Sequence, residues 1–225
     1  MLVLVILSFL ADPFYAANFT PLPIRSKSVF SNPAGLGIQI GAEAFATYHQ
    51  STEAITAGVS AGNLGFGYRK MDTLDFYEVG VGYKLPGAFS LGYAYYFSNS
   101  DTSSHILGIQ CRPSEKLSLG YKTTLGDKNH MYGGIGIMPY FEYITLNFEI
   151  EYEGTDDLFT YYFGAQMQPY KGIRACFMSD KEFNWHAGIE LSFGYMILSG
   201  LYSHEDEKLS AGVIISAQKY PGIMY

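Results

Sequence analysis

ITLNFEIEYE, residues 144–153, alternates between apolar and polar side chains along its whole length. One face carries Ile144, Leu146, Phe148, Ile150 and Tyr152, and the other carries Thr145, Asn147, Glu149, Glu151 and Glu153. Successive side chains of a β-strand point to opposite faces, so this period of two predicts a strand with one apolar and one polar face. About ten residues is also the length that a tilted strand needs to cross the hydrocarbon core of a membrane.

The same alternation recurs along the chain from residue 36 onward, interrupted by turn residues about every 10 to 16 positions. It begins with residues 36–49, where Leu36 starts the apolar face and Gly37 the polar face. Pro86-Gly87 and Gly126-Asp127 are typical turn pairs between such segments. The pattern predicts an all-β fold of about fourteen antiparallel up-and-down strands over residues 36–225.

Alternation alone does not separate a membrane barrel from a soluble barrel or sandwich. Three features favour the membrane: the polar faces are rich in Gly, Ser and Thr, most segments reach nine residues, and aromatic residues end the apolar faces. Examples of these aromatic residues are Tyr48, Tyr83 and Tyr152. Because an open sheet edge in lipid would leave backbone groups unpaired, the sheet must close. We therefore expect a transmembrane β-barrel in the bacterial outer membrane, with the lipid bilayer as its partner.

The composition excludes several other classes. Charged residues make up 16% of the chain, and the net charge is −7, whereas nucleic-acid binding needs a surplus of Lys and Arg. A mean hydropathy of +0.05 does not favour helical membrane spans. Two cysteines, Cys111 and Cys176, are too few for a disulfide scaffold. By parity, Cys111 points outward and Cys176 inward.

The chain begins with an apolar run, Met1–Leu10, of the length of a signal-peptide core. Ala16 and Ala17 offer small residues for cleavage, so residues 1–17 are assigned to an imperfect signal peptide. No Lys or Arg precedes the run, and Phe14 stands two positions before Ala16. Another role for this run therefore stays open.

A short motif lies just before the first alternating segment. It reads Ser31, Asn32, Pro33, Ala34, Gly35 and Leu36. Asn32 can cap a turn or short helix, Pro33 fixes φ, and Gly35 allows a sharp change of direction. An ordinary Asn-Pro turn is the alternative interpretation of these residues.

The motif and the barrel together resemble the FadL-like outer-membrane proteins and the related PorV/PorQ group associated with type IX secretion. In those families the motif belongs to a hatch folded inside the barrel, so the resemblance implies that residues 18–35 form an N-terminal hatch and residues 36–225 the barrel. Two features depart from the family: the predicted loops are short, and Pro21 to Lys27 replace an expected glycine-rich segment. No ligand-contacting residue can therefore be carried over.

Charged side chains are expected in the lumen. Glu149, Glu151 and Glu153 share the polar face of one strand and would create a cation-selective field. Several basic residues also point inward by parity, so mutual pairing is the alternative. They are Arg69, Lys84, Arg112, Lys116, Lys122 and Arg174.

No pattern in the sequence points to catalysis, a metal or a cofactor. His49, His130 and His186 fall on inward faces without the spacing of metal ligands. No serine occurs in the context of a Ser/His/acid site, so we expect no enzyme. Two functions remain: passive transport of a small molecule, which could be hydrophobic, past the hatch, or a non-transporting adaptor barrel that partners secretion components.

Overall fold

The computed structural model describes residues 19–22, 25–38, 41–50, 52–126, 129–140, 143–154, 158–205 and 207–217. These residues form fourteen strands that close into one barrel. The strands are β1 (Ala42–His49), β2 (Ala54–Ala61), β3 (Leu64–Met71), β4 (Leu74–Lys84), β5 (Phe89–Ser98), β6 (Ser103–Ser114), β7 (Leu117–Gly126), β8 (His130–Tyr140), β9 (Ile144–Glu153), β10 (Leu158–Tyr170), β11 (Ile173–Asp180), β12 (Trp185–Ser192), β13 (Met196–Ser203) and β14 (Lys208–Ser216). The predicted all-β fold and strand number are confirmed.

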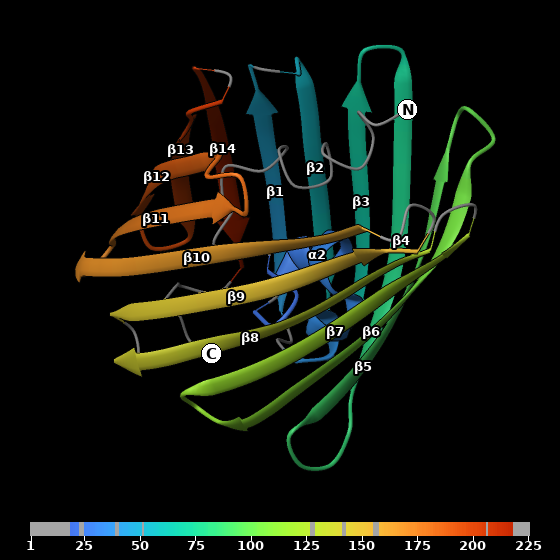
Figure 1. The fold of residues 1–225 in the computed structure, drawn as a ribbon, viewed down its shortest axis with the longest axis horizontal. Helices are drawn as coiled ribbons and strands as arrows, with labels where there is room; N and C mark the ends of the chain where they lie inside the picture. Colours follow the sequence, from blue (N-terminus) through green and yellow to red (C-terminus); the bar gives the residue numbers. More distant parts are fainter. Residues whose placement is uncertain are drawn as a thin grey trace.

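Each strand pairs antiparallel with the next, and β1 closes the barrel against β14 (Figure 1). Consecutive strands are joined by short connections, such as Gly62-Asn63 between β2 and β3. The longest connections have four residues, as between Ser98 and Ser103. No strand connection is therefore long enough to fold far into the lumen. Among the described residues, no helix is long and apolar enough to cross a bilayer.

The outward faces are apolar, as parity predicts. In β1, Ala44 and Tyr48 are exposed while Glu43 and His49 are buried inside. Large apolar side chains such as Phe148, at 41% exposure, cover the outside of the barrel. Water would disfavour so extensive an apolar surface, whereas the hydrocarbon of a bilayer matches it. The barrel therefore lies in a lipid bilayer.

Two strand boundaries differ from the prediction. The first strand begins at Ala42 rather than at Leu36, and Leu36 belongs instead to η3 (Pro33–Gly37), a short 3-10 helix. Asn32 caps η3, and Pro33 starts it with a favourable φ. The alternation around Trp185 also predicts a strand that starts at Phe183, but β12 begins at Trp185 because Phe183 takes a positive φ of 64° in the preceding turn. Local turn chemistry thus overrides the alternation at both places.

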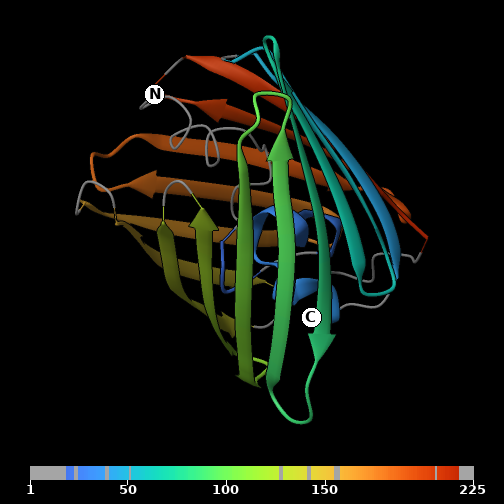
Figure 2. The same ribbon diagram turned by 90° about the vertical axis from the view of Figure 1, so that its right-hand side faces the viewer.

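The described residues 19–22 and 25–37 lie inside the barrel. They include η2 (Arg25–Lys27), α2 (Ser28–Ser31) and η3, and Figure 2 shows their blue ribbon between opposite walls of the sheet. Residues 19–22 and 26–37, apart from Phe30, are buried where described. We call the described residues 19–22 and 25–37 the inner segment. The predicted signal peptide, residues 1–17, lies outside the described residues, as do residues 18, 23 and 24.

Candidate lumen site

A row of inward-facing glycines on β3 to β8 receives the inner segment. A Cβ atom at Gly92 would overlap backbone atoms of Pro33 and Ala34, and one at Gly120 would overlap Thr20. Only glycine allows two backbones to approach so closely. We call this row the glycine seam. Its members are Gly65, Gly67, Gly80, Gly82, Gly92, Gly108, Gly120, Gly134 and Gly136.

Polar side chains beside the seam donate hydrogen bonds to carbonyl groups of the inner segment. Ser90 Oγ lies 2.5 Å from the carbonyl oxygen of Ala34. Gln110 Nε2 and Ser118 Oγ both donate to the carbonyl oxygen of Pro21, over 2.8 and 2.5 Å. These wall residues come from the neighbouring strands β5, β6 and β7, so three strands together hold the segment in place.

Charged side chains of the wall also contact the segment. The backbone N–H of Thr20 donates to Glu149 Oε2 over 2.6 Å. Ser26 donates to Glu43 Oε1 from its hydroxyl, at 2.5 Å, and from its N–H, at 3.2 Å. Lys122 Nζ donates to the carbonyl oxygen of Phe30 over 3.4 Å. Hydrogen bonds to charged groups are stronger than those between neutral groups.

Asn32 joins the inner segment to itself and to the wall. Its Oδ1 accepts the N–H of Ala34 at 3.1 Å, while its Nδ2 donates to the carbonyl oxygens of Thr20, at 3.0 Å, and Ile109, at 3.2 Å. The side chain is fully buried. The rest of the motif, Pro33, Ala34, Gly35 and Leu36, is also buried in η3. Asn32 therefore fixes the fold of the segment and its seat on β6.

Two apolar clusters connect the segment to the wall away from the seam. Phe19 packs with Cys176, Met178 and Leu201, from β11 and β13. Phe30 packs edge-on to Phe45 of β1, with ring centroids 6.0 Å apart, and this cluster also contains Ile197 and Ile214. The segment therefore bridges opposite walls. Cys176 points inward, as parity predicted.

The predicted lumen acids of β9 occupy different environments. Glu149 is fully buried against Thr20. Glu151 accepts a hydrogen bond from Tyr162 at 2.9 Å and lies 3.3 Å from His130 Nδ1. Glu153, near the end of the strand, is half-buried. These three residues therefore do not form a uniform row of water-exposed charge.

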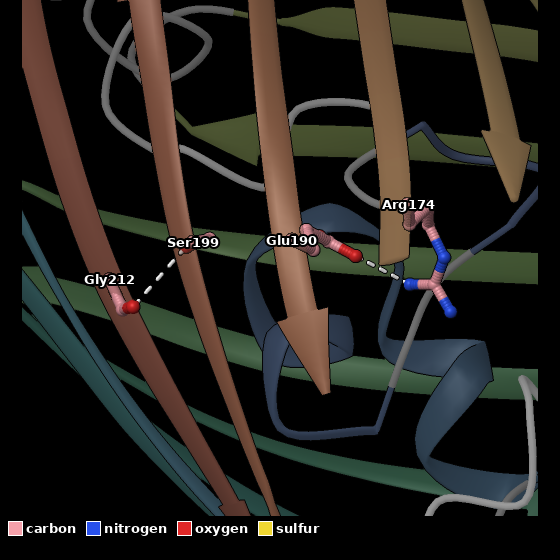
Figure 3. A network of polar contacts seen from close by, with 4 residues as sticks. All are labelled: Arg174, Glu190, Ser199 and Gly212. Carbon is pink, nitrogen blue, oxygen red and sulfur yellow. Dashed lines mark hydrogen bonds and ion pairs between the residues drawn. The ribbon is translucent and has the colours of Figure 1, made fainter. Parts of the chain in front are cut away.

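The predicted basic residues are also separated. Arg69 lies over the Phe30 ring, 5.3 Å from its centroid. Arg112 is half-buried near the end of β6, and Lys84 is exposed at the end of β4. In another part of the wall, Arg174 of β11 forms an ion pair of 2.5 Å with Glu190 of β12 (Figure 3). Pairing of lumen charges thus occurs between β11 and β12.

The glycine seam was not predicted as a site from the sequence, and neither were the wall residues Ser90, Gln110, Ser118 and Glu43. The signal was present: inward positions of successive strands repeat Gly, at Gly80 and Gly82 and again at Gly92 and Gly108. Small inward residues on adjacent strands leave room for another backbone. Which segment fills that room depends on the barrel register, which a single strand pattern does not contain. No group of metal-ligating side chains occurs among the residues that the structure describes.

Comparison with known proteins shows the fold. No family model and no curated protein matches the sequence. Among solved structures, the Acinetobacter baumannii outer membrane protein Omp33 is similar with a TM-score of 0.58 and 10% identity, over 79% of this chain and 97% of that one. A triple mutant of the Rhodopseudomonas blastica porin gives a TM-score of 0.51 and 9% identity, over 78% and 98%. This outer-membrane barrel fold and the apolar exterior locate the chain in the bacterial outer membrane.

Proposed function

We propose that this chain is a passive channel for small polar molecules and that the inner segment closes its lumen. The observation that carries the proposal is that polar and charged side chains inside the barrel are completely buried. Lys27, Asn32 and Glu149 have no exposed surface, although a barrel of fourteen strands is wide enough to contain water or an inserted element. The inner segment supplies that element and acts as the hatch that the family resemblance implies.

The way the segment is held favours a removable closure. In the described part of the chain it contacts the wall through side-chain hydrogen bonds and the two apolar clusters. The strand ladder runs unbroken around it. The described part of the segment can therefore leave its seat without breaking a ladder hydrogen bond, because it takes no part in the strand ladder.

The lumen lining favours a polar rather than a hydrophobic solute. Glu43, Glu78, Glu149 and Glu190 all point inward from four different strands and are buried. A hydrophobic molecule would have to displace polar contacts without replacing them, which is unfavourable. This revises the hydrophobic solute considered from the sequence.

A disulfide between the segment and the wall tests the closure. A Cβ at Gly65 would lie 3.3 Å from the Cβ of Val29, close to the range of about 3.5 to 4.5 Å for disulfides. The variant Val29→Cys/Gly65→Cys is made with Cys111 and Cys176 replaced by Ser. In planar bilayers we expect stable conductance steps with a reductant and their loss on oxidation. The single variants Val29→Cys and Gly65→Cys are the controls, the second because a Cβ at Gly65 would also lie 2.9 Å from Leu36 Cδ2.

Conductance that does not respond to the redox state of the double variant would contradict a moving segment. The absence of conductance in every state, including the wild type, would instead favour the second function, an adaptor barrel of the PorV kind. The tight packing of Phe19 and Phe30 against the wall favours that alternative. Co-purification of secretion components with the wild type would then be the decisive measurement.

A further inference from the structure

Besides its contacts with side chains, the wall forms hydrogen bonds with the backbone of the inner segment. Between described residues, the wall donates hydrogen bonds to the carbonyl groups of Pro21, Phe30 and Ala34 and accepts from the N–H groups of Thr20 and Ser26. Such hydrogen bonds recognise the peptide group, which every residue carries, rather than a particular side chain. The wall would therefore accept other peptides that follow the same path.

The wall groups that make these contacts are prepared for a peptide. Ser90, Gln110, Ser118 and Glu149 are each at most 1% exposed. Gln110 Nε2 and Ser118 Oγ lie 3.0 Å apart, so they hold each other in position beside one carbonyl group. Buried polar groups need partners. When the segment moves away, water reaches these groups, and a peptide that offers both carbonyl and N–H groups can replace that water with the same hydrogen bonds.

The glycine seam restricts the shape of that molecule. At Gly92 and Gly120 the backbone of the segment rests directly on the wall, and the residues there are Pro33, Ala34, Thr20 and Pro21. A peptide with small residues can approach in this way. A sugar of similar mass offers hydroxyl groups on a bulky ring and cannot lie flat against the strand backbones.

We propose that the solutes of this channel are short peptides with small side chains, and that the inner segment occupies their binding track. The track consists of Ser90, Gln110, Ser118 and Glu149 beside the glycine seam. This inference rests on the proposed function, because a peptide reaches the track only when the segment has moved. The segment then competes with the peptide for the same hydrogen-bonding groups.

Swelling of proteoliposomes that contain the full-length protein tests the proposal. The probes are tri-alanine and glucose, and the quantity compared is the ratio of their uptake rates. A ratio cancels differences in how often the segment moves, and glucose is the smaller molecule, so sieving by size alone would favour the sugar. We expect the wild type to take up tri-alanine at least fivefold faster than glucose.

Gln110→Met removes the amide donor at nearly constant volume and should reduce the ratio at least threefold. Ser199→Ala is the matched control, because Ser199 points into the lumen but donates to Gly212 of the neighbouring strand (Figure 3). It should leave the ratio unchanged. A wild-type ratio near one, or a ratio that Gln110→Met does not lower, would overturn the peptide track.

The two proposals fail in distinguishable ways. If the reduced Val29→Cys/Gly65→Cys protein conducts and the oxidised protein does not, but tri-alanine has no advantage, the channel stands and the peptide inference is overturned. If no variant admits either solute and none conducts, the channel is overturned and the peptide inference with it.

Discussion

At the scale of single residues, Asn32 contributes most to the fold of the inner segment. Its side chain makes three hydrogen bonds, to Ala34, Thr20 and Ile109. In Asn32→Ala, buried partners lose their hydrogen bonds, which costs about 1 to 3 kcal/mol. We expect amide hydrogen exchange in residues 28–37 to accelerate about tenfold for each 1.4 kcal/mol lost. Exchange in the strands should stay unchanged.

The control for this prediction is Asn99→Ala. Asn99 makes comparable hydrogen bonds, to the carbonyl of Thr73 at 3.1 Å and to Asp75, but lies in an exposed turn. Its loss should not accelerate exchange in the inner segment. Equal acceleration in both variants would mean that the segment responds to general loosening of the barrel rather than to Asn32.

Glycine residues have different structural roles on the inner and outer faces of the barrel. At Gly92 a Cβ would overlap Pro33 and Ala34, whereas at Gly200, on the outside, the nearest atom is the Ser210 carbonyl oxygen at 3.9 Å. We expect Gly92→Ala to expose residues 28–37 to proteolysis and Gly200→Ala to leave them protected. Alanine at Gly200 should even stabilise the strand by roughly 0.5 to 1 kcal/mol. Protection of the segment in both variants would refute the close contact at the seam.

At the scale of elements, alternation predicts each strand because lipid and lumen select different side chains at every second position. The alternation also predicted that Cys176 points inward, and Cys176 is buried in the structure. It failed at Leu36 and Gly37, which continue the period of two but belong to η3. Leu36 is buried inside the lumen against Gly65 and Gly80. An apolar residue before a strand gives the same sequence pattern whether its side chain faces lipid or the inner wall of the barrel.

The outer face of β9 provides a prediction about the bilayer. Phe148 points outward near the middle of the strand and is 41% exposed. Phe148→Lys should lower the free energy of unfolding by roughly 2 to 4 kcal/mol, because the charge must enter hydrocarbon. Urea titration in lipid vesicles measures this change. Asn99→Lys, in an exposed turn, should cost less than about 0.5 kcal/mol, and equal costs would contradict the assignment of the lipid face.

At the scale of the whole molecule, the contacts inside the barrel could not be predicted from the sequence. Parity placed Glu149 and Arg69 inside, but their contacts with Thr20 and Phe30 join positions far apart in the chain. Those contacts depend on the path of the inner segment relative to the closed sheet. The motif Asn32-Pro33 indicated a turn at this place, and only the structure shows that the turn rests on β5 and β6.

The charge of the lumen gives the last prediction. Removal of the inner segment takes away the buried Lys27 and the contacts that Thr20 and Ser26 make with Glu149 and Glu43. Among the described wall residues, Arg174 and Glu190 pair with each other. The other buried acids, Glu43, Glu78, Glu149 and Glu151, outnumber the half-buried basic residues Arg69, Arg112 and Lys122. A pore formed by a variant lacking residues 19–37 should therefore prefer cations.

The measurement is the reversal potential in a salt gradient across a planar bilayer. The deletion variant should give a potential of the sign expected for cation preference, and adding Glu149→Gln should move it towards zero. Restoring conductance without cation preference would show that the acids are neutralised by other wall residues. A deletion variant that inserts with a closed barrel, as judged by its strand-dominated circular dichroism spectrum, yet conducts no better than the intact protein would refute the idea that the inner segment closes the lumen. Because the strand ladder is continuous without the segment, we expect the barrel to persist and the pore to open.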